Sequence, residues 1–355
     1  MKKKKICYVI NSVKRCGPVN ILVSMIRGIN HKKFDVTIVT LLNDNDNLFL
    51  EELKKLNIEI INFNYPKTFF TMLKKKEICS KLNNMNFDII HVHGHITAIL
   101  TDDVKTKKVI TVHNKMYEDF KNSYGKVIGL IITKKYVQSL KKFDKVICCS
   151  ESSFNICKKY ISDISFVRNG MYIEKKNDKL EIRKNIRKQL NIPSNSIIYI
   201  YAGNYSKIKN VLKMLSFFEK NLKENEYLIC LGQGELFEKA RVYSSEHIIQ
   251  LGFVENVNDY MISSDIYTSF SITEGLPVSI IEALNAGLLL LVSNIDSHNE
   301  IINIDKSFYI GETFDDSNFV EKKEIVSHSQ KNDSTNMQLK YLSENSMMQE
   351  YEKFY

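Results

Sequence analysis

The chain has 355 residues, 44% of them hydrophobic, which is enough for two domains with cores of their own and excludes wholesale disorder. Fifty lysine and arginine residues against forty-one aspartate and glutamate residues give a net charge of +9. That charge suits an anionic ligand or an anionic membrane surface, or it belongs to a lysine-rich solubilising surface. Because no helix-turn-helix pattern or stripe of basic and aromatic residues is present, nucleic acid is not an expected partner.

The cysteines and the start of the chain bear on its compartment. Seven cysteines without a CxxC motif favour reduced thiols in a cytoplasmic protein. The lysine-rich start is followed by an apolar run at 6–10 that is too short for a signal peptide and predicts a first strand. No run reaches the ~20 apolar residues of a membrane span. We therefore expect a soluble or peripheral protein.

Short apolar runs alternate with helical patterns along the whole chain, for example with helices at 19–30 and 51–57. The expected strands are residues 5–11, 34–42, 58–63, 87–94, 107–114, 144–150, 164–170, 196–203, 226–232, 247–253, 265–271, 288–294 and 307–311. Strands separated by helices are typical of parallel sheets covered on both faces. We predict an α/β fold of two doubly wound Rossmann-like domains that face each other across a cleft.

A charged stretch divides the chain. We place an N-terminal domain at 1–172, a linker at 173–195 and a C-terminal domain at 196–336. Because ligands of open parallel sheets bind beyond the carboxyl ends of the strands, the site residues should lie on loops that follow strands.

The tail turns polar before a last expected helix at 337–355. We expect this helix to pack back on the first domain through Tyr341, Tyr351 and Phe354.

The segment EGLPVSIIEALNAG, residues 274–287, predicts a loop and then a helix, with Pro277 in the first turn and Gly287 at the end. A helix N-terminus offers N–H groups and a partial positive charge, which suit a phosphate. Carboxylates on either side of it, Glu274 and Glu282, suit the hydroxyls of two sugars that flank a diphosphate, as in a nucleotide-sugar. Alternatively, Glu274 complements the helix dipole and Glu282 faces solvent.

This segment resembles the E-x7-E signature of family-4 retaining glycosyltransferases, which have the two-domain GT-B fold. The resemblance implies that Glu274 holds the hexose of the donor and Glu282 the ribose of its nucleotide. It also implies that Gly275, Leu276 and Pro277 bind the donor near its distal phosphate.

The segment YAGNYSKIKN, residues 201–210, resembles the family pattern G-R-x4-K, whose arginine and lysine neutralise the donor diphosphate. Gly203 and Lys209 match its glycine and lysine, but Asn204 stands at the arginine position. The phosphate site is thus one cation short unless Lys207 or another residue compensates. Taken alone, Lys209 could also be a surface lysine.

Two more segments of the second half agree with the resemblance. LGQGEL, residues 231–236, resembles a glycine-rich turn of the family, although on its own it is any tight turn. LGFVENVNDYMISSDIY resembles the segment whose backbone contacts the nucleotide base, which implies that Gly252, Phe253 and Val254 bind the donor.

The first half offers two further resemblances. RCGPVNILVSMIRG, residues 15–28, resembles the family's glycine loop, where Gly17 would let the backbone approach the donor phosphate; a helix-capping turn is the alternative. TVHN resembles the TxH segment, which implies that His113 bonds to the donor hexose, with His93 as a second residue on the acceptor side. Either histidine could instead be structural.

Alternating histidines raise the question of a metal. His91, His93 and His95 would share one face of a strand, where imidazoles could bind zinc. No cysteine or acidic partner lies nearby, so we expect no metal.

Residues 124–145 form a candidate basic amphipathic helix, with Lys158 and Lys159 nearby. It could rest on an anionic membrane surface, where lipid-linked acceptors of cell-envelope polysaccharide synthesis lie. A solvated helix face is the alternative.

Taken together, the resemblance implies a retaining, metal-independent glycosyltransferase without a cofactor. It would move a hexose or N-acetylhexosamine from a UDP-linked donor to a saccharide or polyprenyl-linked acceptor in capsule or other cell-surface polysaccharide synthesis. The alternatives are a nucleotide-sugar epimerase of the same fold and a degenerate nucleotide-sugar-binding protein. Asn204 and the shortened stretch at 301–335 favour the degenerate protein.

Overall fold

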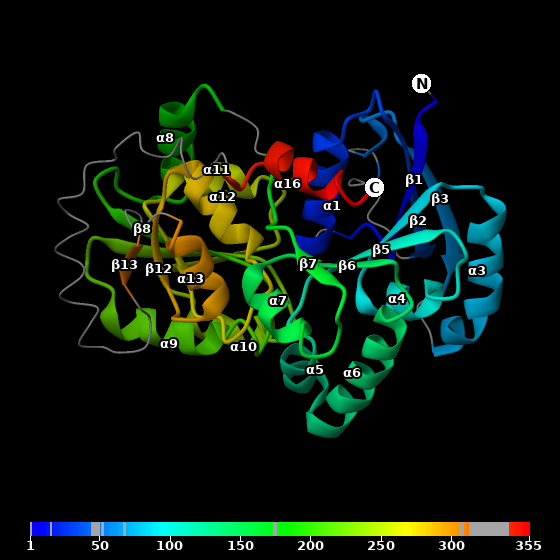
Figure 1. The fold of residues 1–355 in the computed structure, drawn as a ribbon. Coiled ribbons are helices and arrows are strands. Elements are labelled where there is room, and N and C mark those ends of the chain that lie inside the picture. The colour runs from blue at the N-terminus through cyan, green and yellow to red at the C-terminus, as the bar shows by residue number, and fades with distance from the viewer. Residues whose placement is uncertain are drawn as a thin grey trace. The chain divides into compact units, whose positions relative to one another are not determined.

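The computed structural model describes residues 2–14, 16–43, 50, 53–66, 69–172, 176–304, 309–311 and 341–355. The chain divides into two compact units, residues 1–172 with 341–355 and residues 173–340 (Figure 1). Each unit is built on one parallel sheet with helices between its strands, so the predicted fold of two doubly wound α/β domains is confirmed.

Unit 1 has a seven-stranded sheet in the order β3-β2-β1-β4-β5-β6-β7, all parallel. Its strands are β1 (Lys4–Ile10), β2 (Phe34–Leu42), β3 (Glu59–Tyr65), β4 (Ile89–His93), β5 (Lys107–Val112), β6 (Lys145–Cys148) and β7 (Ile164–Phe166). Every strand expected in this half is confirmed. The central strands are buried along nearly their whole length, as parallel strands covered on both faces must be.

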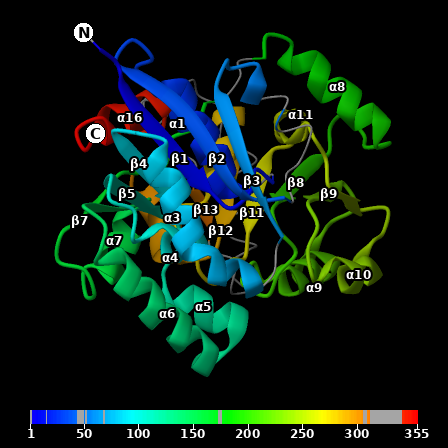
Figure 2. The same ribbon diagram turned by 90° about the vertical axis from the view of Figure 1, so that its right-hand side faces the viewer.

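The helices of unit 1 cover both faces of this sheet. They are α1 (Gly17–Gly28), η1 (Phe69–Lys74), α3 (Lys75–Asn84), α4 (His95–Thr101), α5 (Tyr117–Tyr124), α6 (Lys126–Leu140), α7 (Glu151–Cys157) and α16 (Glu344–Tyr351) (Figure 2). Cys7 and Val9 of β1 point to the core shared with α3, α4 and α6, and the intervening Tyr8 points to the C-terminal residues. The helix expected at 51–57 lies partly outside the described residues.

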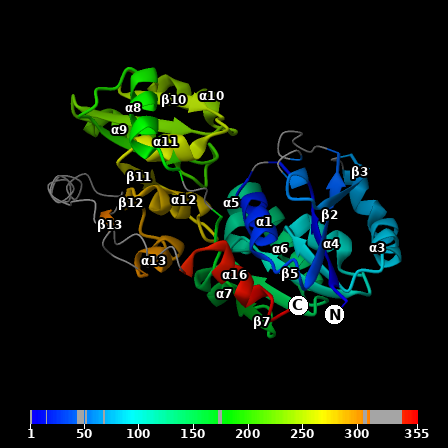
Figure 3. The same ribbon diagram turned by 90° about the horizontal axis from the view of Figure 1, so that it is seen from above.

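Unit 2 has a six-stranded parallel sheet in the order β10-β9-β8-β11-β12-β13. Its strands are β8 (Ile197–Ala202), β9 (Glu226–Leu231), β10 (Ile248–Gly252), β11 (Ile266–Ser269), β12 (Leu289–Val292) and β13 (Tyr309–Gly311). Its helices are α8 (Lys179–Gln189), α9 (Val211–Asn221), α10 (Phe237–Ala240), η2 (Arg241–Tyr243), α11 (Val257–Ser263), α12 (Val278–Ala286) and α13 (Asp296–Ile302). Figure 3 shows this unit with its helices α8 and α11. The strands expected in this half are also confirmed, although residues 307 and 308 of the last expected strand lie outside the described residues.

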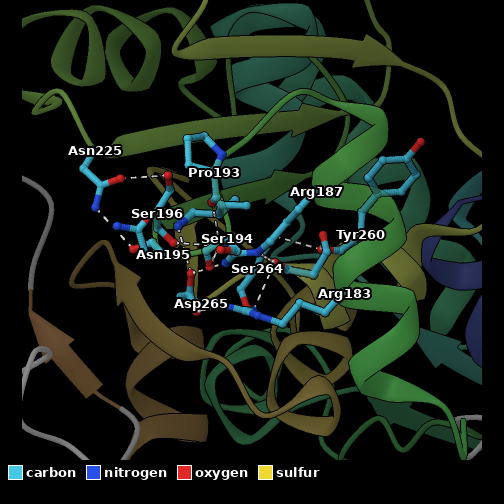
Figure 4. A network of polar contacts seen from close by, with 12 residues as sticks. Arg183, Arg187, Pro193, Ser194, Asn195, Ser196, Asn225, Tyr260, Ser264 and Asp265 are labelled. Carbon is cyan, nitrogen blue, oxygen red and sulfur yellow. Dashed lines mark hydrogen bonds and ion pairs between the residues drawn. The ribbon is translucent and has the colours of Figure 1, made fainter.

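The stretch expected as a linker at 173–195 contains α8, which is tied into unit 2 by two arginines (Figure 4). The buried Arg187 donates to Asp265 at 2.8 Å and to the carbonyl oxygens of Ser263 and Ser196 at 3.1 and 2.8 Å. Arg183 donates to the other carboxylate oxygen of Asp265 at 2.6 Å. Because these contacts fix α8 at the amino end of β11, α8 is part of the second unit.

The C-terminal helix α16 packs into unit 1, partly by residues other than those expected. Tyr351 is fully buried, but Tyr341 is 64% exposed, so the expectation that Tyr341 packs was wrong. Tyr355 packs there instead of Tyr341. Its hydroxyl forms hydrogen bonds with the hydroxyl of Tyr8 at 3.1 Å and with Nδ1 of His91 at 2.5 Å. The start of the expected helix, 337–340, lies outside the described residues.

The basic helix expected at 124–145 is α6, but it is shorter at both ends (Lys126–Leu140), and Tyr124 belongs to α5. Gly125 adopts a positive φ of 83°, which ends α5 and begins α6. Only a residue without a Cβ takes this conformation readily, so the helical pattern breaks there. The description as amphipathic was also wrong for the first half of α6, since apolar side chains lie on its exposed face as well as its buried face.

Candidate active site

The carboxyl edge of the sheet in unit 2 brings three glycines together. The N–H of Gly232 donates to the carbonyl of Gly252 at 2.7 Å, and the N–H of Gly203 donates to that of Leu231 at 3.0 Å. A Cβ on Gly232, whose φ is 116°, would lie 2.0 Å from the carbonyl oxygen of Gly203. Only glycine permits this approach, so the loops after β8, β9 and β10 form one close-packed surface.

Asn204, at the expected arginine position, lies exposed on that surface. A Cβ on Gly234 would lie 2.1 Å from its Oδ1, and the hydroxyl of Tyr201 donates to its carbonyl oxygen at 2.9 Å. The side chain therefore packs against the glycine turn after β9. Lys207, which could supply the missing charge, is also exposed.

Glu274 and Lys209 lie on loops that follow β11 and β8, and the structure joins them in an ion pair. Ser271 donates a second hydrogen bond to the same carboxylate oxygen at 2.7 Å. Burial alone would raise the pKa of Glu274, but the charge and hydrogen bond of Lys209 and the hydrogen bond of Ser271 bring it below its ordinary value. Glu274 is thus held as an oriented carboxylate.

Helix α12 begins one residue later than expected. Pro277 is its N-cap rather than a first-turn residue, and Gly287 ends it in the left-handed conformation at φ 85°, as predicted. The loop residues Gly275 and Leu276 are buried against the body of the unit. The N–H groups at the start of α12 therefore lie beside Glu274 without a side-chain cap.

Glu282 lies in the middle of α12, between buried neighbours. It is half-buried, and burial raises its pKa to about 7. Burial raises the pKa of Tyr267, and the charges of Glu274 and Glu282 raise it further. Both glutamates therefore lie close enough to the Tyr267 phenol of β11 to act on it electrostatically.

Phe253 and Val254 follow β10 directly. Gly252, with φ 70°, turns the chain there, and the Phe253 side chain is left 51% exposed. An exposed ring at the carboxyl edge of a parallel sheet is able to stack on a planar ligand.

The two histidines singled out in unit 1 are bonded to each other. His93 ends β4 and His113 follows β5, with His93 Nδ1 and His113 Nε2 2.9 Å apart, so one of these nitrogens donates to the other. The rings stack with centroids 5.2 Å apart. Burial lowers the pKa of His113 to about 4 and that of His93 well below its ordinary value. Both imidazoles are therefore neutral at pH 7.

The expectation that three alternating histidines share a strand face was wrong for His95. His91 and His93 do stack, with centroids 4.7 Å apart, but β4 ends at His93. His95 starts α4, and its ring packs on Phe120. Among the described residues, no group of three or more His, Cys, Asp or Glu side chains is placed to hold a metal ion.

Gly17 is the first residue of α1, directly after the extended Cys16. Pro18 follows it in the first turn, a position that suits a residue without an N–H. The structure thus places Gly17 at a helix start, as the sequence predicts.

Two polar residues near Glu274, Ser271 and His298, were not predicted from the sequence. Ser271 bonds Glu274, and the carbonyl oxygen of Ser271 accepts from Ser293 at 2.6 Å. His298 of α13 lies within 2.8 Å of the Ser293 carbonyl oxygen, and its proximity helps to lower the pKa of Glu274. The spacing of Ser271 three residues before Glu274 could have indicated Ser271, but no local pattern indicates His298.

The chain is similar to known glycosyltransferases over most of its length. Residues 17–175 match the model of Glycosyltransferase Family 4, and residues 182–343 match that of Glycosyl transferases group 1. The chain is 25% identical to the O-antigen biosynthesis glycosyltransferase WclY of Escherichia coli, over 92% of this chain and 89% of the relative. It is 26% identical to the UDP-Gal:alpha-D-GlcNAc-diphosphoundecaprenol alpha-1,3-galactosyltransferase of Escherichia coli, over 67% and 66% of the two chains.

A solved structure shares the fold. Alr3699/HepE of Anabaena, in complex with UDP-glucose, aligns with a TM-score of 0.78 and 15% identity, covering 99% of this chain and 98% of that one.

Proposed function

We propose that this chain, whose two halves match the Glycosyltransferase Family 4 and Glycosyl transferases group 1 models, is a retaining, metal-independent glycosyltransferase that uses a UDP-linked sugar. It moves a hexose or N-acetylhexosamine to a saccharide or polyprenyl-linked acceptor in cell-surface polysaccharide synthesis, in contact with an anionic membrane. The relative that acts on a diphosphoundecaprenol acceptor supports the acceptor class, and the neighbour with bound UDP-glucose supports the donor class.

The observation that carries the proposal is the Lys209–Glu274 pair beside the start of α12. A lysine has three N–H donors, so Lys209 can keep Glu274 and still donate to a phosphate oxygen. Glu274, ionised and oriented, then accepts hydrogen bonds from hexose hydroxyls. The N–H groups at the start of α12 bind the donor phosphate, to which Lys209 also donates.

Glu282 supplies the ribose contact in this proposal. Burial raises the pKa of Glu282 to about 7. When two ribose hydroxyls donate hydrogen bonds to the ionised carboxylate, they stabilise its charge. In this proposal the base stacks on the exposed ring of Phe253, beside Val254 and Gly203.

The leaving diphosphate is stabilised by Lys209 and the helix start. In a retaining reaction the leaving phosphate oxygen helps to deprotonate the attacking hydroxyl on the same face of the sugar, so no side chain is required as general base. His113 is neutral and serves as a hydrogen-bond partner of the donor hexose, with His93 fixing its tautomer and Gly17 near the phosphate.

Calorimetry with UDP tests the proposal. Glu282→Ala should weaken UDP binding by tenfold or more, whereas the control Glu238→Ala, at an exposed position of α10, should leave it unchanged. Glu274→Ala should reduce sugar transfer more than UDP binding. Unchanged UDP affinity of Glu282→Ala would remove the ribose role.

A degenerate binding protein is the second candidate, because Asn204 replaces the arginine. A thermal-shift screen of nucleotides and nucleotide-sugars, followed by a transfer assay, separates the candidates: a protein stabilised by UDP-sugar but unable to transfer it supports the degenerate one. Conversion of the donor sugar without an acceptor would identify the epimerase.

A further inference from the structure

An apolar patch lies on the pair of helices α5 and α6 in unit 1. Five of the fourteen exposed large apolar side chains among the described residues fall within eight positions here, so they form a cluster rather than scattered single residues. We call these the α5–α6 patch: Tyr124, Val127, Ile128, Leu130 and Ile131. Val127 alone is 73% exposed.

The patch is held on rigid elements. A Cβ on Gly129 would lie 2.7 Å from the backbone N of Lys121, so α5 and α6 are in close contact, and Gly125 makes the turn between them. The opposite face of α6 is anchored in the core by Tyr136 and Leu140. Helix α6 is therefore well packed against unit 1, and the apolar side chains on its outer face are exposed even so.

The apolar and charged residues are separated along α6. After Lys126 at its start, the exposed side chains of its first half are apolar, and those of its second half include Lys134 and Lys135. Lys121 and Lys126 flank the turn, and α6 contains no acidic residue. In the part of the chain that the structure describes, none of these four lysines forms an ion pair.

We propose that the α5–α6 patch inserts into the surface of an anionic lipid bilayer. Apolar side chains enter the acyl boundary while lysines around them contact lipid phosphates, and Tyr124 suits the interface between the two regions. A protein partner is a poorer match, because lysine is depleted in the cores of protein interfaces. Figures 1 and 2 both show α5 and α6 projecting beyond the other elements of unit 1.

No helix among the described residues is long and apolar enough to cross a bilayer, so the proposed contact is peripheral. The inference deepens the membrane contact in the proposed function and rests on it for its biological setting. Here the insertion of apolar side chains adds to the attraction of the lysines for anionic lipid.

Vesicle co-sedimentation of the full chain tests the proposal. Vesicles of phosphatidylglycerol and phosphatidylcholine should bind the protein, and Val127→Gln with Ile131→Gln should weaken the binding at least tenfold. The matched control carries Leu180→Gln and Val242→Gln, which are 86% and 79% exposed but isolated in unit 2, and should bind as the wild type does. Vesicles of phosphatidylcholine alone should bind more weakly in every case.

UDP calorimetry on the same variants keeps the two proposals separate. The Val127 and Ile131 variant should retain UDP affinity, which also shows that it is folded. Equal vesicle binding by this variant and the control would overturn the insertion, whatever the result with UDP. A dimer in light scattering that this variant abolishes, without vesicle binding by the wild type, would assign the patch to a second copy of the chain and also overturn it.

Discussion

Glu282 provides a test in which stability and binding change in opposite directions. Its pKa is raised from the ordinary 4.5 to about 7 by burial in α12. The folded state therefore binds more protons than the unfolded state between these values, and the stability of unit 2 falls as pH rises through that window. Glu282→Gln removes the charge while keeping the shape, so it should stabilise the unliganded protein above pH 7.

The magnitude follows from the pKa change. At about 1.36 kcal/mol per pH unit, the full penalty is roughly 3 kcal/mol at pH 8, reduced somewhat because Glu282 is only half-buried. At pH 5 the same expression leaves less than about 1 kcal/mol. In a unit of this size the gain at pH 8 corresponds to a rise of roughly 5–10 °C in Tm.

Thermal unfolding of wild type and Glu282→Gln at pH 5 and pH 8, with and without UDP, measures the effect. We expect a higher Tm for the variant at pH 8 without ligand, little change at pH 5, and a smaller stabilisation by UDP. Glu274→Gln is the matched control and should lower Tm at pH 8, because it leaves Lys209 without its carboxylate. A Tm difference for Glu282→Gln that is the same at both pH values would refute the reasoning.

Three further predictions concern the buried polar contacts. Asp265→Ala leaves the buried Arg187 without its carboxylate and should cost unit 2 about 3–5 kcal/mol in urea unfolding; an unchanged midpoint would contradict this. Tyr355→Phe removes the hydroxyl bonded to His91 and should destabilise unit 1 by about 1–3 kcal/mol by the same measurement, where no loss would mean that this bond adds nothing. His113 should show no NMR titration between pH 8 and 6, and unit 1 should lose stability as pH falls from 6.5 toward 4, because the unfolded state then binds more protons; an inflection near 6.5 would rule out its burial as a neutral imidazole.

The residue pattern predicted the strands because each is a short apolar run between helical stretches, and a strand buried on both faces must be apolar throughout. The same pattern placed the site residues on loops after strands, since the carboxyl ends of parallel strands lie on one edge. Departures began where the outcome depends on distant contacts. His95 leaves the strand face that its spacing predicts, and Tyr341 lies exposed although a packed position was predicted.

The sequence by itself determined the two parallel sheets, the loops that carry Glu274 and Lys209, and the helix start beside them, because these depend on local hydrophobic period and on turn residues. Only the tertiary structure decided that Tyr355 rather than Tyr341 packs on the sheet, and that Glu282 has a raised pKa. When the elements pack, they bury side chains and bring together residues that lie far apart in the chain. A local residue pattern therefore cannot predict these contacts or the pKa shifts that burial causes.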